Sequence, residues 1–108
     1  MIKKIERVSK KLFQEIFSKG GYKHSPIFSA KIAPSNDGVT RFAVVVPKTV
    51  FKKAHDRNRI RRIFYASIKD KDTKVIKNRV YIFICKKEIS KYDKSDIQEE
   101  VRIFFNTF

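Results

Sequence analysis

A dense run of positive charge between residues 48 and 62 is the part of this sequence best suited to bind another molecule. The run holds seven basic residues against one acid, Asp56. The basic residues are Lys48, Lys52, Lys53, Arg57, Arg59, Arg61 and Arg62. Arginine keeps its charge at physiological pH, and its planar guanidinium matches phosphate oxygens and guanine edges. This density therefore indicates a polyanionic partner.

The same run has the spacing of an amphipathic helix. At about 100° per residue, four apolar side chains fall on one stripe of such a helix. They are Ile60, Ile63, Phe64 and Ile68. The residues on the opposite face are Asn58, Arg61, Arg62 and Lys69, with Arg57 and Arg59 beside the stripe. We expect a helix docked through its apolar stripe that presents a rigid basic ridge to its partner.

Composition favours the same class of partner. The 108 residues include 26 Lys and Arg against 11 Asp and Glu, which gives a formal net charge of +15. Such a charge attracts nucleic acid or anionic lipid. The longest apolar run, Val80 to Cys85, has the length of a strand and falls far short of the roughly 20 residues of a membrane span. Because the N-terminal residues also lack the apolar segment of a secretory signal, we expect a cytoplasmic protein with no membrane partner and a single domain, residues 1–108.

Residues that could carry catalysis form no recognisable constellation. His24 and His55 are separated by a predicted hairpin, and their spacing does not select an acid–base pair, so we expect surface or RNA-contacting histidines. One cysteine and two distant histidines cannot make a tetrahedral zinc site. The acids between residues 93 and 100 fall at a predicted helix start, where carboxylates interact favourably with the helix dipole. We therefore expect no catalytic residue and no metal site in the protein itself.

Aromatic side chains could add base stacking to phosphate contacts, provided that they are exposed on one face. The candidates are Phe13, Phe17, Phe28, Phe42, Tyr22 and Tyr81. With ten Phe and no Trp in the chain, most aromatic rings must fill the core, so both interpretations stay open for each candidate. Phe64, Phe104 and Phe105 fit the core better. The single cysteine, Cys85, lies in an apolar run and is expected to be an inert buried thiol.

Two further helices are predicted, one before the strand segments in the sequence and one after them. The first begins after a capping Ser9 and stops at Gly20-Gly21. Its apolar residues are Leu12, Phe13, Ile16 and Phe17. The last helix follows a capping box at residues 95–98. Its apolar residues are Ile97, Val101, Phe104, Phe105 and Phe108.

Three segments have the composition of β-strands: residues 27–33, 39–47 and 80–85. Residues 34–38, with Pro, Asn, Asp and Gly, carry strong turn chemistry, so the first two segments are expected to form an antiparallel hairpin. Residues 42–46 are apolar on both faces, which is typical of an interior strand. The order of elements read from the residues alone is α-β-β-α-β-α.

The stretch from Lys48 to Arg62 closely resembles the protein subunit of bacterial ribonuclease P. That family carries an Arg-Asn-Arg signature, here Arg57-Asn58-Arg59, followed by Ile60 and two basic residues. The resemblance extends over most of the chain, because residues 13–17 match a Phe-x-x-Val-Phe element of the first helix and residues 80–87 match the last strand with its basic end. Departures occur at Thr49, where the family has a second Lys, at residues 64–66, where it has Arg-Glu, and at Val80, where it often has an acid.

The resemblance implies an α+β fold. It is an α/β sandwich with a mixed four-stranded sheet in the order α-β-β-β-α-β-α. The additional strand would come from a split within Tyr22 to Ala33. The β-α-β crossover that carries the arginine helix would be left-handed, against the usual rule.

The resemblance also implies a function. The chain would be a subunit of an endoribonuclease whose RNA removes the 5′ leader of precursor tRNA, with magnesium held mainly by that RNA. The protein would bind the catalytic RNA and the leader, and no DNA. The implied RNA-binding residues are Lys48, Lys52, Lys53, Arg57, Asn58, Arg59, Arg61 and Arg62, and the implied leader cleft consists of Phe13, Phe17, Phe28 and Lys86.

Other functions compete with this interpretation. A small ribosomal or other structural RNA-binding protein would use the same charge equally well. An autonomous protein nuclease would need catalysis by residues such as His55. Binding to double-stranded DNA is disfavoured, because no compact helix-turn-helix pair is evident.

Overall fold

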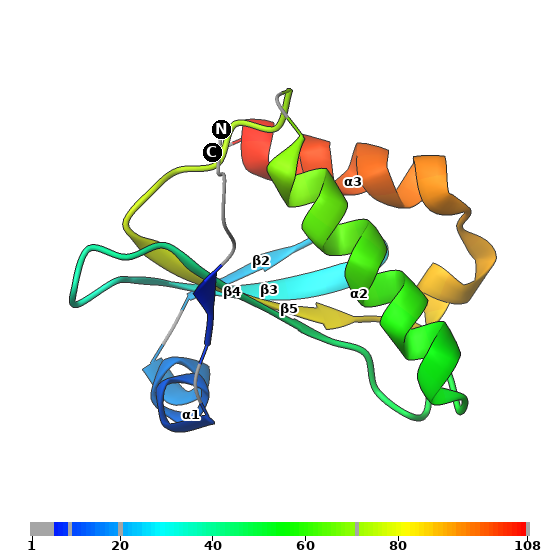
Figure 1. Cartoon of the computed structure of the whole chain (residues 1–108), viewed down its shortest axis with the longest axis horizontal. Coiled ribbons are helices and arrows are strands. Elements are labelled where there is room, and N and C mark those ends of the chain that lie inside the picture. Colours follow the sequence, from blue (N-terminus) through cyan, green and yellow to red (C-terminus); the bar gives the residue numbers. More distant parts are fainter. Residues whose placement is uncertain (1–5, 9, 20, 71, 108) are drawn as a thin grey trace.

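Two helices cover one face of a central β-sheet, and a third helix lies on the other face (Figure 1). The computed structural model describes residues 6–8, 10–19, 21–70 and 72–107, with the backbone alone at residues 6, 7, 17 and 19. The elements are β1 Glu6–Arg7, α1 Lys10–Lys19, β2 Gly21–His24, β3 Phe28–Pro34, β4 Arg41–Val45, α2 Ala54–Lys69, β5 Arg79–Cys85, the 3-10 helix η1 Lys87–Lys91 and α3 Lys94–Asn106.

The sheet is mixed, as expected. Across the described residues its strand order is β1-β4-β5-β3-β2. β5 runs parallel to β4 and antiparallel to β3, while β2 runs antiparallel to β3. The predicted order α-β-β-β-α-β-α is confirmed by α1 to α3, with the two-residue β1 added beside β4. Helix α2 joins the parallel neighbours β4 and β5; the left-handed sense of this crossover stays a prediction.

The split that the resemblance implied within residues 22–33 is confirmed. β2 and β3 form a hairpin in which Tyr22 pairs with Lys31 and His24 with Ser29. Between them the Ser25 amide donates to the carbonyl of Phe28 at 2.8 Å, which closes the turn. Pro26 lies inside this turn and has no amide hydrogen to continue a ladder. The segment at residues 27–33 thus supplies the second strand of the β2–β3 hairpin.

The hairpin predicted between residues 27–33 and 39–47 is wrong. These segments become β3 and β4, which run antiparallel but are not neighbours, because β5 lies between them. The residues from Val80 to Phe83 are buried on both faces of the sheet, at 1% exposure or less. Inserting β5 covers the most apolar strand on both sides, and burial of apolar surface is the main driving force of folding. The connection at residues 35–40 therefore joins β3 to β4 past the end of β5, which lies between them.

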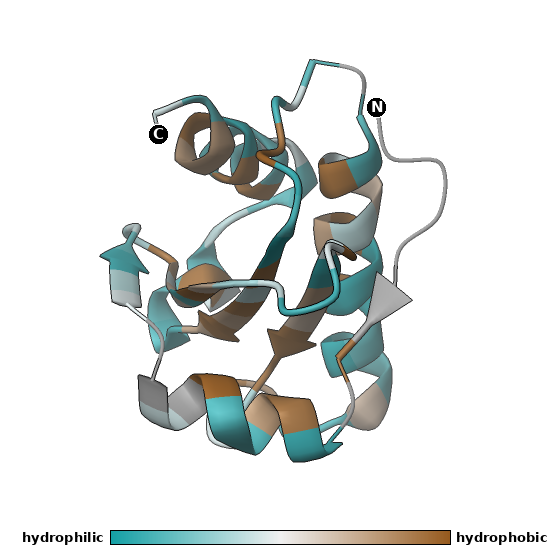
Figure 2. Ribbon diagram, turned by 90° about the vertical axis from the view of Figure 1, so that its left-hand side faces the viewer, coloured by the Kyte–Doolittle hydropathy of each residue, from teal (hydrophilic) through white to brown (hydrophobic). Residues whose placement is uncertain are grey.

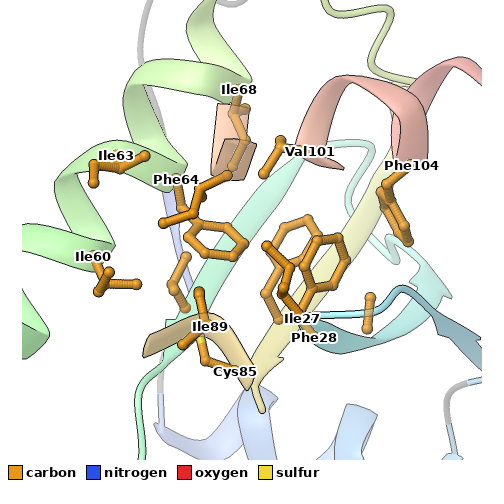
Figure 3. Packing of buried hydrophobic residues seen from close by; sticks show 14 of the residues in the cluster. Ile27, Phe28, Ile60, Ile63, Phe64, Ile68, Cys85, Ile89, Val101 and Phe104 are labelled. Carbon is orange, nitrogen blue, oxygen red and sulfur yellow. The ribbon is translucent and has the colours of Figure 1, made fainter. Parts of the chain in front are cut away.

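The predicted apolar stripe of α2 is confirmed. Ile60, Phe64 and Ile68 are almost fully buried, and Ile63 nearly so. These side chains meet Val101 and Phe104 of α3 and Phe28 of the sheet in one cluster (Figure 3). Figure 2 shows hydrophobic residues along the central strands and hydrophilic residues on the outer faces of the helices. The core thus fixes α2 with its basic side turned to solvent.

Helix α3 begins two residues earlier than the predicted capping box requires. Its N-cap is Asp93, whose carboxylate accepts from the amide of Asp96 at 2.9 Å. Ser95, the predicted cap, instead donates from its hydroxyl to the same carboxylate. A carboxylate at the N-cap satisfies a free amide and also interacts with the helix dipole, which explains why it takes this position. Ile97, Val101, Phe104 and Phe105 are buried as predicted; Phe108 lies outside the described residues.

A smaller apolar cluster attaches α1 to the opposite face of the sheet. Ile16 packs with Val80 and Ile82 of β5, and Leu12 and Phe13 lie against them. The residues predicted to start and stop this helix, Ser9 and Gly20, lie outside the described residues. Across the described ranges no helix has the length and apolar character needed to cross a membrane. Helix α1 thus covers one face of the sheet, and α2 and α3 cover the other.

Candidate nucleic-acid interface

The eight predicted RNA-binding residues come together on the loop before α2 and on the first three turns of this helix. We call this set the basic ridge. The exposed members are Lys48, Lys52, Lys53, Asn58, Arg59 and Arg62, whereas Arg57 and Arg61 are half-buried. None of the ion pairs among the described residues involves a member of the ridge. Because no ion pair engages these cations, the ridge presents them to a polyanion.

Backbone hydrogen bonds shape the loop that precedes α2. The amides of Val50 and Phe51 both donate to the carbonyl of Pro47, at 3.0 and 3.3 Å. Arg57 then reaches back from α2, and its Nη1 donates to the carbonyls of Phe51 at 2.9 Å and Lys52 at 2.8 Å. The first arginine of the signature therefore holds the loop in place. A direct contact between Arg57 and RNA stays a prediction, which would use its remaining nitrogens.

Side chains one turn apart order the exposed surface of α2. Arg61 donates from Nη1 to Oδ1 of Asn58 at 2.7 Å. Asn58, Arg61, Arg62 and Tyr65 line a shallow hollow of about 400 Å³. Since the asparagine carbonyl fixes the direction of the guanidinium, Arg61 loses less side-chain freedom when it meets a phosphate.

The second candidate surface lies on the α1 face of the sheet. Residues that pair across strands share a face, so the register places Tyr22 and Lys31 beside Ile82, and His24 and Ser29 beside Ile84. Ile82 belongs to the cluster that packs against α1. The β2 end of this face is thus polar and aromatic, and it lies beside the helix that carries Phe13.

Four side chains on β2 and β3 form an ordered group, which we call the β2 platform: Tyr22, His24, Ser29 and Lys31. The Tyr22 and His24 rings stack with centroids 5.5 Å apart and an interplanar angle of 9°. Lys31 Nζ lies 4.6 Å from the centroid of the Tyr22 ring, and His24 Nδ1 lies 2.9 Å from Ser29 Oγ. Tyr22 is 53% exposed. An exposed ring held by a lysine and a histidine can stack an unpaired base.

Sequence reasoning found only part of this platform. Tyr22 is one of the six aromatic candidates for stacking, and His24 is expected to be a surface or RNA-contacting histidine. Ser29 and Lys31 were missed. The signal that could have found them is the two-residue period of the strands, which places alternate polar residues of 22–24 and 29–31 on one face.

Of the four residues predicted for the leader cleft, the structure describes the side chains of three. Phe13 is half-buried and packs against the small cluster under α1, and the side chain of Phe17 lies outside the described residues. Lys86 is half-buried, and its Nζ donates to the carbonyl of Ser25 at 2.9 Å. The prediction for Phe28 is wrong, because this ring has 0% exposure and lies on the face covered by α2 and α3.

Burial of Phe28 follows from its neighbours. Its ring makes edge contacts with those of Phe64, Phe83 and Phe104, at centroid distances of 5.3 to 5.5 Å. Two more aromatic candidates, Phe42 and Tyr81, are also buried in this cluster, at 1% and 0% exposure. Edge-to-face contacts of this kind stabilise a core beyond the area that they bury. These three rings are structural.

The two histidines do not form an acid–base pair. His24 lies on the α1 face of the sheet, whereas His55 lies in the first turn of α2, which covers the other face. His55 Nδ1 is 3.4 Å from Oδ1 of its neighbour Asp56. Between residues 6 and 107, leaving out those not described, no group of three or more His, Cys, Asp and Glu could hold a metal ion.

The basic ridge lies on α2, the helix that connects the adjacent parallel strands β4 and β5. This is the arrangement that the resemblance implies. A family model of ribonuclease P matches residues 2–108 of the chain. The chain belongs to the ribonuclease P protein family. It is thus the protein subunit of ribonuclease P, an endoribonuclease that acts in the 5′ processing of precursor tRNA. This membership decides against the small ribosomal or other structural RNA-binding protein.

Solved structures of ribonuclease P proteins share this fold. The protein from Thermotoga maritima is 19% identical, with a TM-score of 0.83, over 95% of this chain and 97% of the other. The Staphylococcus aureus protein in a 2.0 Å structure is 20% identical, with a TM-score of 0.84, over 96% of this chain and 95% of the other. A comparison with curated proteins gave no significant match. At these identities the structures show the fold, and the roles of individual residues rest on the geometry described above.

Proposed function

We propose that this subunit binds two RNAs on two separate surfaces. The basic ridge on α2 would bind the catalytic RNA of ribonuclease P, and the β2 platform with Phe13 would bind the single-stranded 5′ leader of precursor tRNA. The observation that carries the proposal is the separation of the two surfaces by the sheet, since α2 packs on one face and the platform belongs to the other. In this proposal the protein acts in the cytoplasm, where it holds both RNAs in one complex.

The chemistry of each surface matches its proposed ligand. The ridge offers Lys and Arg side chains on a rigid helix, which suits the regularly spaced phosphates of a folded RNA. The platform offers the stacked rings of Tyr22 and His24, which suits an unpaired base, and the buried Lys31 lies over the Tyr22 ring. A folded RNA exposes mainly phosphates, whereas a leader exposes its bases, so the two surfaces would not compete for the same ligand.

Magnesium enters this proposal as a ligand of RNA. Among the residues that the structure describes, no group of three or more His, Cys, Asp and Glu could hold a metal ion. Magnesium prefers oxygen ligands and binds readily to phosphates. The protein would act by electrostatics instead, since its cations reduce the repulsion between two RNA backbones that must lie close together.

Reconstitution with a bacterial ribonuclease P RNA tests this function. We expect the protein to lower the magnesium concentration needed for half-maximal removal of the leader from precursor tRNA. It should also increase the affinity of the complex for precursor tRNA more than for mature tRNA, because only the precursor has a leader. Lys77→Gln, an exposed change in the loop before β5, serves as a control that removes one charge outside both surfaces.

Two results would contradict the proposal. One is a magnesium requirement that the protein does not change. The other is leader cleavage by protein freed of RNA, which would favour the autonomous nuclease. A double change on the ridge, Lys52→Gln with Lys53→Gln, should weaken binding to the catalytic RNA and leave the preference for leader-bearing tRNA intact in the complexes that do form.

A further inference from the structure

A hollow lies between α2 and the beginning of α3, where Arg59 and Arg62 of the basic ridge meet three residues that the resemblance does not assign to RNA binding, Ile63, Ala66 and Lys94. It has a volume of about 340 Å³ and is lined by Arg59, Arg62, Ile63, Ala66 and Lys94. Ile63 and Ala66 give it an apolar floor. Arg59 and Arg62, one turn apart on α2, and Lys94, the first residue of α3, stand around this floor. The lining contains no acid, so the hollow would attract an anion.

The three cations are available to a ligand. The side chains of Arg59, Arg62 and Lys94 are exposed, and none of them forms a hydrogen bond or an ion pair with another described residue. The acid nearest to Lys94 in sequence, Asp93, is engaged as the cap of α3 through the amide of Asp96 and the hydroxyl of Ser95. Buried residues fix both helices beneath the hollow, since Ile60 of α2 and Ile97 of α3 have 0% exposure. The positions from which the cations project are therefore set before any ligand arrives.

The combination of an apolar floor with a cationic rim selects the occupant. A phosphate in a regular duplex would use the cations but not the floor, because paired bases are stacked inside the helix. An unpaired nucleotide presents both parts, a base with a flat apolar face and an anionic phosphate. Single-stranded loops and bulges of RNA place such nucleotides where proteins can reach them. Arginine can also stack its guanidinium plane on the base.

Arg62 connects this hollow to the one beside it. The neighbouring hollow is lined by Asn58, Arg61, Arg62 and Tyr65, so Arg62 stands between the two. Tyr65 is half-buried and brings an aromatic ring to that second hollow. A strand that crosses α2 could place successive nucleotides on either side of the Arg62 guanidinium.

We propose that the hollow between α2 and α3 binds an unpaired nucleotide of the ribonuclease P RNA. Its base would lie on Ile63 and Ala66, and its phosphate would lie among Arg59, Arg62 and Lys94. This inference rests on the proposed function, in which α2 binds the catalytic RNA. It adds to that function a binding site for a single nucleotide and assigns a residue of α3, Lys94, to RNA binding.

Two variants separate the base from the phosphate. Ala66→Leu fills the hollow without a change of charge, and we expect about fivefold to tenfold weaker binding of the catalytic RNA with an unchanged salt dependence. Lys94→Gln removes one cation, and we expect weaker binding with a salt slope reduced by about one unit. Base-selective chemical probing of the RNA should show one or two nucleotides that the wild-type protein protects and both variants leave reactive. Lys77→Gln should change neither the probing pattern nor the affinity.

The outcomes distinguish failure of this inference from failure of the proposed function. If the wild-type protein does not bind the catalytic RNA, both the proposed function and the nucleotide site are overturned. If the wild-type protein binds and stimulates cleavage while Ala66→Leu and Lys94→Gln match it in affinity and probing pattern, the proposed function stands and the nucleotide site is overturned. Ala66 and Lys94 are exposed, and urea unfolding of each variant shows whether the fold is retained.

Discussion

Arg57 and Phe51 are joined by a hydrogen bond of 2.9 Å from the guanidinium Nη1 to a backbone carbonyl. The same nitrogen also donates to the carbonyl of Lys52 at 2.8 Å. The bonds link the first turns of α2 to the loop that carries Lys48 and Lys52. A residue that the signature assigns to RNA binding therefore also determines where other cations of the basic ridge lie.

Replacement of Arg57 should cost stability as well as RNA affinity. Hydrogen bonds to charged groups contribute about 1.5 to 3 kcal/mol, and less where water can replace them. Because Arg57 is half-buried, we expect Arg57→Ala to lower the free energy of unfolding by about 1 kcal/mol, measured by urea denaturation. Arg59→Ala is the matched control, since Arg59 is exposed: stability should stay within about 0.5 kcal/mol while the salt slope of RNA binding falls by about one unit. Equal destabilisation by the two changes would show that Arg57 does not brace the loop.

Tyr22 should contribute to binding of the leader through its ring. Stacking of a base on an aromatic side chain is worth about 1 to 3 kcal/mol. Tyr22→Ala is expected to weaken binding of precursor tRNA by about fivefold to tenfold and to leave mature tRNA unaffected. Tyr22→Phe keeps the ring over which Lys31 lies and should retain most of the affinity. A loss of similar size for both tRNAs would remove the β2 platform from leader binding.

Phe28 should behave as a core residue in spite of its assignment to the leader cleft by resemblance. Its ring has 0% exposure and contacts three other aromatic rings. We expect Phe28→Leu to lower the free energy of unfolding by about 1 to 2 kcal/mol, since the smaller side chain leaves space in a close-packed core. Leader affinity, measured below the unfolding transition, should equal that of the wild type. A selective loss of leader affinity with unchanged stability would place Phe28 in contact with RNA.

Asp37 should make stability depend on acid pH. The Arg41 guanidinium, through two hydrogen bonds of 2.8 Å, and the Ser35 hydroxyl hold the pKa of this carboxyl well below its ordinary value of 3.8. Because the pKa is lower in the folded state, the contribution to stability is fully present above the unfolded pKa, near 4, and is lost as the pH falls toward the folded value. Asp37→Asn should therefore lose less stability than the wild type between pH 5 and pH 3. Parallel pH profiles in urea denaturation would contradict this assignment.

Cys85 should be unreactive in the folded protein. Burial raises the pKa of its thiol to about 12, and its side chain lies in the cluster under α2. Since the thiolate is the nucleophile, a thiol-specific disulfide reagent at pH 8 should modify Cys85 only after denaturation. Cys85→Ser provides the blank in both states. Equal rates of Cys85 modification in native and denatured protein would show that β5 opens freely.

The sequence by itself determined the features that depend on residues close together along the chain. The stripe of Ile60, Ile63 and Phe64 predicts a buried helix face, because the helical period depends only on local geometry. The apolar run at residues 80–85 predicts a buried strand for the same reason. The signature at residues 57–59 predicted the family, and the family model confirmed it.

Only the tertiary structure decided which segments meet. The insertion of β5 between β3 and β4 depends on which strand gains most from burial on both faces, and that is a property of the whole sheet. An aromatic residue on a strand has the same local pattern whether two helices or solvent cover its face, so that pattern cannot distinguish the buried Phe28 from the exposed Tyr22. Lys94 lies 32 positions beyond Arg62, and the two meet at one hollow because α2 and α3 pack on the same side of the sheet. Contacts of this range are determined by packing, which no local period encodes.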